Sequence, residues 1–257
     1  MPADPFRIIA HRGASAYAPE NTIAAFEKAV AMGVTEVETD LHFTKDGQVL
    51  LLHDHTLDRT TNGSGRPADY TLSQLKELDA GSWLDQAQNP DFKWEEDFAG
   101  EPLITLAELF ARFGRDLNYH IEIKDRAPGI VPAAMEQVQA YGLVDKVFFY
   151  IADDKSFLLE AKRLEPRIRT ELAPVQQLRK GAAEAIRATA RAGHDIVALP
   201  TAYHSKELVE LAHSCGMEAR SLGIRNPQDM VDSVEAGSNG MTINWPDWLI
   251  DYIAAQT

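Results

Sequence analysis

The sequence predicts an α/β protein built as a closed (β/α)8 barrel, and three observations favour this fold. Short apolar runs alternate with longer amphipathic stretches along the whole chain. The chain has 257 residues, and one barrel of this kind needs roughly 250. Nine runs have the composition of buried strands, one more than the barrel requires. An open, doubly wound sheet is the alternative, but no glycine-rich phosphate-binding sequence supports it.

The first predicted elements are a strand at 6–10 and a helix at 21–32. The strand is a short apolar run, and the helix repeats apolar residues at helical spacing. Asn21 or Thr22 is the expected N-cap, and Gly33 supplies the C-terminal stop.

The next two strands, predicted at 36–40 and 49–52, are joined by a short connection with the turn sequence Lys45-Asp46-Gly47. A parallel crossover needs about a dozen residues or more, so this gap is too short for one. The two strands therefore form a hairpin, and 49–52 is the irregular ninth strand.

The later strands alternate with helical patterns, as the barrel requires. We predict strands at 119–123, 147–150, 168–172, 196–199, 217–222 and 240–243. The clearest helices are expected at 155–164, 178–192, 205–214 and 227–236. Residues 55–100 interrupt this alternation and carry several turn signals, Asn62-Gly63 among them. We therefore predict one domain over residues 1–257, with a small, partly helical insertion at about 55–100 above the barrel mouth.

Composition excludes several classes of partner. Asp and Glu total 39 against 25 Lys and Arg, and the net charge of −14 disfavours binding to nucleic acid. No apolar run approaches the roughly 20 residues of a transmembrane helix, and the N-terminus does not resemble a signal peptide. The single cysteine, Cys215, forms no intramolecular disulfide. We expect a cytoplasmic protein with a small-molecule partner; the sequence leaves the oligomeric state open.

Polar side chains gather where several predicted strands end. His11 and Arg12 follow the first strand, and Glu38 and Asp40 lie on the second. Because alternate residues of a strand share a face, both carboxylates point the same way. His53 follows the hairpin strand. The carboxyl ends of barrel strands surround the active site of such enzymes, so these groups are candidates for catalysis.

A later strand adds Glu122 and Lys124, which also share a face. Three carboxylates on neighbouring strands repel one another unless a cation lies between them, and oxygen ligands suit Mg²⁺ or Ca²⁺. Two histidines suit a general acid and a general base, whereas Arg12 and Lys124 suit an anion such as phosphate. The sequence therefore predicts metal-assisted phosphoryl transfer. We expect structural roles for the remaining histidines, which are His42, His55, His120, His194, His204 and His213.

The order of these groups resembles that of the glycerophosphodiester phosphodiesterase family. The likeness covers nearly the whole chain and is strongest over residues 8–124. The matching motifs are Ala10-His11-Arg12-Gly13, Pro19-Glu20-Asn21-Thr22, Glu38-Thr39-Asp40, Thr44-Lys45-Asp46-Gly47, His53-Asp54, Arg59-Thr60-Thr61-Asn62-Gly63, Pro102-Leu103-Ile104-Thr105-Leu106 and Ile121-Glu122-Ile123-Lys124.

The resemblance implies a TIM barrel that uses one divalent cation, Mg²⁺ or Ca²⁺. Its expected substrates are glycerophosphodiesters such as glycerophosphocholine and glycerophosphoethanolamine, hydrolysed to sn-glycerol 3-phosphate and an alcohol. It further implies that His11 and His53 are the acid–base pair. The implied metal ligands are Glu38, Asp40 and Glu122, and the implied substrate and phosphate contacts are Arg12, Lys124, His53 and Glu122.

Two late segments depart from the family pattern. Many relatives carry Trp-Thr-Val-Asn where this chain has Ser221-Leu222-Gly223-Ile224-Arg225-Asn226. The final strand commonly ends Thr-Asp-x-Pro and here ends Ile243-Asn244-Trp245-Pro246. The missing tryptophan would give the substrate site an aromatic wall. Two other residues are candidates to replace it, Trp245 and Tyr150. The alternative is that both rings pack in the core.

Two other functions are weighed against this one. A lysophospholipase D or phospholipase-type enzyme needs an apolar groove, but the spacing of the apolar residues of the insertion suits a packed helix better; they are Leu72, Leu75, Leu78, Trp83 and Leu84. A non-catalytic phosphodiester sensor would be expected to lack part of the acid–base or metal set, and all five groups are present here.

Overall fold

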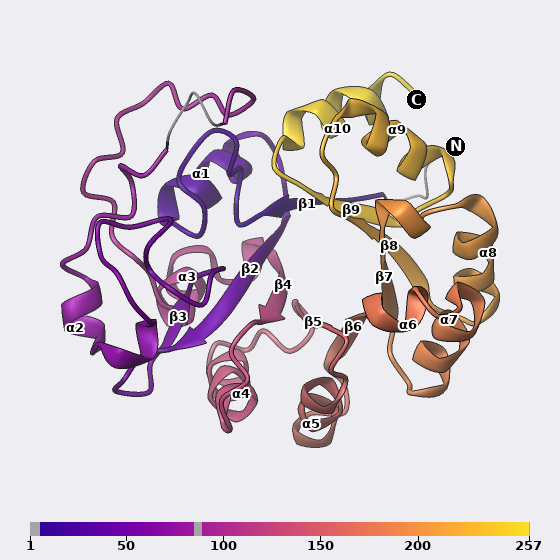
Figure 1. Ribbon diagram of the computed structural model, residues 1–257, viewed down its shortest axis with the longest axis horizontal. Helices are drawn as coiled ribbons and strands as arrows, with labels where there is room; N and C mark the ends of the chain where they lie inside the picture. Colours follow the sequence, from indigo (N-terminus) through magenta and orange to yellow (C-terminus); the bar gives the residue numbers. More distant parts are fainter. Residues whose placement is uncertain (1–5, 85–88, 257) are drawn as a thin grey trace.

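The computed structural model describes residues 6–84 and 89–256, and its centre is a closed barrel of eight parallel strands (Figure 1). Around the ring the order is β1-β2-β4-β5-β6-β7-β8-β9, and β9 pairs with β1 to close it. The strands are β1 (Arg7–His11), β2 (Glu36–Phe43), β3 (Val49–Leu51), β4 (Asn118–Ile123), β5 (Val147–Ala152), β6 (Arg169–Ala173), β7 (Ile196–Pro200), β8 (Glu218–Leu222) and β9 (Gly240–Ile243). The predicted barrel is confirmed.

Helices lie outside the ring of strands and connect them (Figure 1). They are α1 (Ile23–Ala31), α2 (Leu72–Leu75), α3 (Leu106–Phe113), α4 (Ile130–Ala140), α5 (Ser156–Leu164), α6 (Val175–Leu178), α7 (Ala182–Arg191), α8 (Lys206–Ser214), α9 (Pro227–Glu235) and α10 (Pro246–Ala254). Short 3₁₀ turns occur at Pro67–Asp69, Gly114–Asp116 and Thr201–Tyr203.

The predicted hairpin between β2 and β3 is present. The two strands pair antiparallel, with Leu41 opposite Leu51 and Phe43 opposite Val49. This pairing extends β2 to eight residues, beyond the predicted end at residue 40. Gly47 takes a left-handed φ of 75° in the turn, a conformation that glycine adopts without a side-chain clash.

One predicted helix is wrong in its extent. Residues 178–192 do not form a single helix, because α6 ends at Leu178 and α7 begins at Ala182. Gly181 precedes α7, and glycine is a poor helix former since it loses the most backbone freedom on ordering. The apolar spacing alone does not reveal this interruption.

The apolar core lies between the strands and the surrounding helices. On β2 and β4, Val37, Leu41 and Ile121 are fully or almost fully buried in one cluster with helical residues such as Phe26 and Phe110. Because side chains alternate along a strand, the other face of the same strands points into the barrel. The sequence of that inner face is polar, as in the Glu36, Glu38 and Asp40 series of β2.

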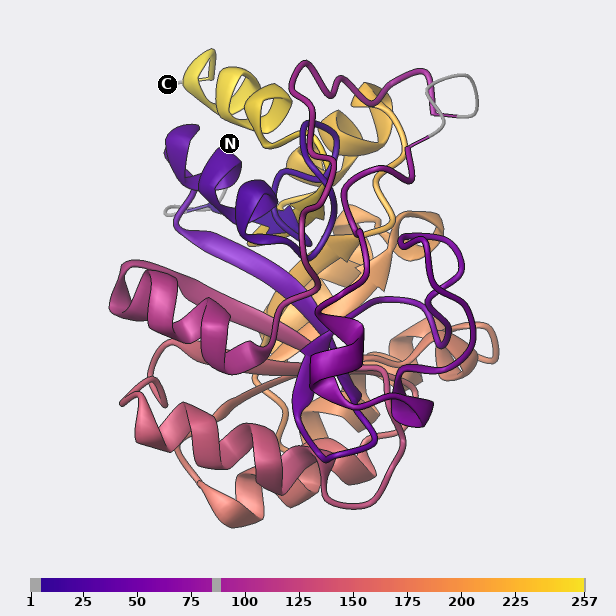
Figure 2. The same cartoon turned by 90° about the vertical axis from the view of Figure 1, so that its left-hand side faces the viewer.

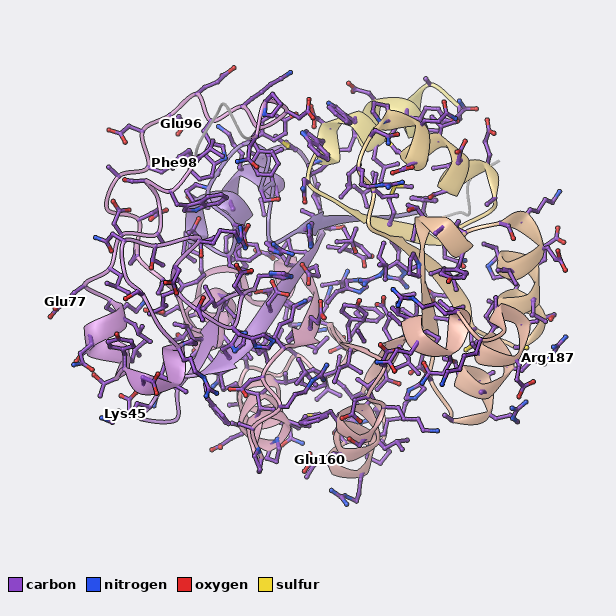
Figure 3. All side chains as sticks on the ribbon, viewed as in Figure 1. Lys45, Glu77, Glu96, Phe98, Glu160 and Arg187 are labelled. Atoms are coloured by element: carbon purple, nitrogen blue, oxygen red, sulfur yellow. The ribbon has the colours of Figure 1, made fainter. Side chains whose placement is uncertain are left out.

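Ion pairs fill the barrel interior below the cavity, toward the amino ends of the strands. His120 bonds Glu36 at 2.8 Å and Glu171 at 3.3 Å across the barrel, and Arg220 pairs with Glu171. Arg7 bonds Glu36 at 2.8 Å. Figure 3 shows side chains crowding the centre of the ring, whereas labelled charged residues of the outer helices, such as Glu160 and Arg187, point outward.

The long segment between β3 and α3 lies on the same side of the barrel as α1 (Figure 1) and faces the viewer in Figure 2. Its regular structure within the described residues is one 3₁₀ turn and the four-residue α2. Leu75 is fully buried with Leu50 and Leu57, and Leu72 and Leu78 pack against the same cluster. These leucines therefore form a small core beneath the segment, as the spacing favoured, and do not line a lipid groove.

Gly13 offers a test of the junction between β1 and α1. Its φ is 83°, and an added Cβ would lie 2.5 Å from the carbonyl carbon of Ala25. Gly13→Ala should therefore combine about 1–2 kcal/mol of backbone strain with about 1–3 kcal/mol of overpacking. Gly47→Ala is the matched control, since Gly47 has φ 75° with nothing within 4 Å of an added Cβ. Urea unfolding measures both variants, and equal losses would contradict the close approach.

Candidate active site

A cavity of about 350 Å³ opens at the carboxyl ends of the barrel strands. Seven residues singled out from the sequence line it: His11, Arg12, Glu38, His53, Glu122, Lys124 and Tyr150. The remaining lining residues are Ala152, Arg220, Leu222, Gly223, Ile224, Thr242 and Asn244. These groups are far apart in the chain and lie together at the carboxyl ends of the barrel strands.

Three buried carboxylates meet beside the cavity. One oxygen from each of Glu38, Asp40 and Glu122 lies within 4.8 Å of the others. The pairing of β2 with β4 explains this proximity, because Asp40 is the direct neighbour of Glu122 across the two strands. Oxygen atoms at this spacing can hold a hard divalent cation.

Two cations balance part of this negative charge. Lys124 Nζ lies 2.9 Å from Glu122 Oε2 and 3.6 Å from Asp40 Oδ1, and Arg12 Nε lies 3.3 Å from Asp40 Oδ2. Burial alone would raise the pKa of Asp40, but Arg12 and Lys124 lower it to about 2. Asp40 therefore stays ionised in the barrel.

Glu38 has the opposite environment. Burial raises its pKa well above the ordinary value, and the charge of Asp40 raises it further. The pKa of Glu122 is also raised by burial, although Lys124 opposes the shift. The three carboxylates thus carry more negative charge than the two cations neutralise when all are ionised. An added positive charge would relieve the repulsion between them.

His11 and His53 both face the cavity and each has a fixed partner. His11 Nδ1 lies 2.6 Å from the side-chain oxygen of Asn244, and His53 Nδ1 lies 2.6 Å from Asp54 Oδ1. Because both partners are oxygen acceptors, each neutral histidine donates its Nδ1–H to its partner and can accept a proton at Nε2. His11 Nε2 lies 3.8 Å from Glu38 Oε2. Burial and the nearby Arg12 lower the pKa of His11 to about 3, so its ring is neutral.

Arg12 occupies a strained backbone conformation with φ 57°. Its N–H donates to the Glu38 carbonyl at 3.0 Å, and its own carbonyl accepts from Asn21 N–H at 3.0 Å. Such strain costs about 1–3 kcal/mol and persists where the surroundings fix the residue. These two hydrogen bonds fix the Arg12 backbone, and its side chain lies beside the carboxylates.

Three residues of the candidate site were not predicted from the sequence or were predicted in another role. Asn21 was a candidate helix cap, but Thr22 caps α1, and Asn21 Nδ2 instead donates to Asp40 Oδ2 at 3.0 Å. Asn244 follows β9, so the rule that selected the other strand-end groups could have found it. Arg220 is only 3% exposed; an arginine inside an otherwise buried strand was the available signal.

The two candidate aromatic replacements lie in different places. Tyr150 lines the cavity, and the Arg220 guanidinium lies 4.8 Å from its ring centre. Trp245 is not among the described residues that line this cavity. It is 5% exposed, stacks on Trp248 at 4.7 Å and donates from Nε1 to the Asp91 carbonyl at 3.0 Å. Trp245 thus packs in the core and fastens the long segment to α10.

The segment that replaces the family tryptophan also borders the cavity. Leu222, Gly223 and Ile224 form this wall with aliphatic groups and backbone.

Asp125, which follows Lys124, accepts from the N–H groups of Phe43 and Ala127 and so anchors the loop after β4.

Comparison with known proteins identifies relatives along nearly the whole chain. The model of the glycerophosphoryl diester phosphodiesterase family matches residues 11–248. A glycerophosphodiester phosphodiesterase of Bacillus subtilis is 36% identical over 251 residues, which cover 93% of this chain and 83% of the relative. One from Caldanaerobacter subterraneus is 34% identical over 96% of this chain and 97% of its own.

Solved structures share the fold. A glycerophosphodiester phosphodiesterase of Agrobacterium tumefaciens superposes with a TM-score of 0.78 at 24% identity, covering 96% of this chain and 99% of that one. A phosphodiesterase of Oleispira antarctica, solved with the product sn-glycerol-3-phosphate, gives a TM-score of 0.77 at 23% identity and 96% coverage of both chains.

Fold and relatives together define a barrel enzyme of the phosphoric diester hydrolase class. The chain belongs to the glycerophosphoryl diester phosphodiesterase family. The family resemblance is thereby confirmed. Within residues 6–84 and 89–256, helices that combine the length and apolar character needed to cross a membrane do not occur.

Proposed function

We propose that this protein hydrolyses glycerophosphodiesters, such as glycerophosphocholine and glycerophosphoethanolamine, to sn-glycerol 3-phosphate and an alcohol. The observation that carries the proposal is the buried carboxylate triad beside a cavity that two histidines and two cationic side chains line. The relatives named as glycerophosphodiester phosphodiesterases support the choice of substrate.

Glu38, Asp40 and Glu122 would hold one divalent cation, Mg²⁺ or Ca²⁺. The donor set fits such an ion, since it consists of oxygen atoms within 4.8 Å of one another. Among the described residues, Asp40 Oδ1 has no hydrogen-bond donor although it is buried. When bound, the cation supplies Lewis-acid polarisation of a non-bridging phosphate oxygen.

Arg12 and Lys124 would bind the phosphate group of the substrate. Each already contacts a carboxylate of the triad, and each lines the cavity. An anion in the cavity would therefore lie beside both cationic side chains. His53 and Glu122 complete the substrate contacts in this proposal.

The two histidines would transfer the protons. His11 accepts a proton from the nucleophile at Nε2, while its Nδ1–H stays bonded to Asn244. His53, which must start protonated on both ring nitrogens, gives the proton on Nε2 to the leaving oxygen as the phosphorus–oxygen bond to the alcohol breaks, and its Nδ1–H stays bonded to Asp54. The nucleophile is either the neighbouring glycerol hydroxyl, which gives a cyclic phosphate first, or a water molecule.

Release of sn-glycerol 3-phosphate from glycerophosphocholine, measured with and without added divalent metal, tests the function directly. Turnover separates this proposal from a phosphodiester sensor, which would bind without forming product. Lysophosphatidylcholine as a second substrate tests the lysophospholipase D alternative, and a preference for it would contradict our choice of substrate.

Metal dependence is expected because the triad carries uncompensated charge. Removal of metal by a chelator should abolish activity, and Mg²⁺ or Ca²⁺ should restore it. Glu122→Gln should weaken cation binding measured by titration calorimetry. Glu165→Gln is the control, since Glu165 is also buried but pairs with Arg167 outside the barrel. Full activity in metal-free protein would contradict the role of the triad.

The acid–base assignment predicts that His11→Ala and His53→Ala each lower kcat by about 10² or more, the usual contribution of a general acid or base. His213→Ala should leave kcat unchanged, because His213 bonds Asn239 near the end of α8, away from the cavity. Circular dichroism checks that each variant folds. Native turnover in either cavity variant would remove that histidine from the mechanism.

Weak discrimination among leaving alcohols is also expected. The cavity wall at Leu222 to Ile224 is aliphatic, and Arg220 covers the Tyr150 ring. A cation–aromatic contact is worth about 0.5–2 kcal/mol, so kcat/KM for choline, ethanolamine and glycerol diesters should agree within about thirty-fold. Leu222→Trp should raise the preference for choline. A native preference above about a hundred-fold would show that another aromatic group contacts the ammonium.

A further inference from the structure

Arg59 belongs to the Arg-Thr-Thr-Asn-Gly sequence, for which the proposed chemistry gives no role. It lies in the loop after β3, outside the described residues that line the catalytic cavity. Its guanidinium donates four hydrogen bonds to two carboxylates. Nε and Nη2 bond Asp54 at 2.7 and 2.9 Å, whereas Nη1 and Nη2 bond Glu20 at 2.9 and 2.8 Å.

Each of these carboxylates contacts a different group of the cavity. Asp54 Oδ1 lies 2.6 Å from His53 Nδ1, and Glu20 Oε1 accepts from Arg12 Nη1 at 3.0 Å. A continuous path therefore runs from His53 through Asp54, Arg59 and Glu20 to Arg12. The path joins the loop after β3 to the loop after β1, which share no strand pairing at this point.

We propose that Arg59 is a positioning residue that fixes His53 for proton donation and ties it to the phosphate-binding Arg12. This proposal rests on the function proposed above.

Asp54 needs such a partner because its side chain is 29% exposed and could otherwise turn toward water. The two parallel bonds from Arg59 restrain both of its oxygens, which is the geometry that only an arginine supplies. Arg59 also lowers the pKa of Asp54, so this side chain remains an acceptor for His53 Nδ1–H. When His53 is protonated on both ring nitrogens, the proton available to the leaving group is then the one on Nε2.

The guanidinium itself is held in place. It lies 5.5 Å from the centre of the Trp83 ring, and Glu20 is only 7% exposed. A general acid must lie within hydrogen-bond reach of its target. A rigid Arg59 therefore keeps Asp54, and through it His53, in position better than a mobile side chain would.

A comparison of two leaving groups tests this role, because a loss of protein stability would affect both substrates alike. Choline leaves as a basic alkoxide and needs a proton, whereas 4-nitrophenol leaves as a stable anion and does not. Arg59→Gln should therefore lower kcat on glycerophosphocholine by about 10² and change kcat on the 4-nitrophenyl ester of glycerol 3-phosphate by less than about threefold. His53→Ala should show the same selectivity.

Arg112→Gln is the matched control. Arg112 also bonds a carboxylate, Glu27, at 2.9 Å and lies 5.4 Å from an aromatic ring centre, but it joins the outer helices α3 and α1. This variant should retain wild-type kcat on both esters. Thermal unfolding of each variant, followed by circular dichroism, measures its stability.

Equal losses on the two esters, or no loss on either, would overturn the role of Arg59. If Arg59→Gln does not fold, Asp54→Asn replaces it, and native rates of that variant on both esters would overturn the proposal as well. If His53→Ala loses kcat equally on the two esters, His53 is not the proton donor. That result would contradict the role of Arg59 but not the proposed diester hydrolysis. Absence of wild-type turnover on both esters would instead contradict the proposed function itself.

Discussion

Charge buried inside the barrel must be matched by charge of the opposite sign, and this constraint governs the structure from its lower layer to its cavity. Deeper in the barrel, Arg7 and the ring of His120 meet Glu36 on a neighbouring strand, and Arg220 of β8 meets Glu171 of β6 across the intervening β7. At the cavity, burial raises the pKa values of Glu38 and Glu122, and the charge of Asp40 raises them further. A barrel interior is usually filled by branched apolar residues; here the ion pairs take that place and leave one unbalanced site at the open end.

Much of the fold was predictable because its elements are local patterns. Strands and helices differ in apolar period, and the short connection before Val49 required a hairpin. Element ends were less accurate, since β2 runs to Phe43 only through its pairing with β3. The break before α7 depends on Gly181, whose effect an apolar pattern does not record.

The cavity was predictable to the extent that its groups lie at strand ends. That rule identified His11, Glu38 and Glu122, but it does not identify residues that act from loops. Arg59 and Glu20 meet through the tertiary fold, and no periodicity relates them. Trp245 also follows a strand end, yet its ring turns into the core. The direction of a side chain after a strand depends on its neighbours, which the sequence does not specify.

The bond between His11 and Asn244 spans 233 positions of the chain, and this separation has a consequence for biosynthesis. The carboxylates of the triad and both histidines lie within the first half of the chain, so a ribosome makes them early. The acceptor that orients His11 comes from the segment after the last strand, and β9 must pair with β1 before the ring closes. Because a domain folds as a unit, a nascent chain would carry the three carboxylates and both histidines well before Asn244 can meet His11. The contact between His11 and Asn244 therefore forms only after β9 has been synthesised and has paired with β1.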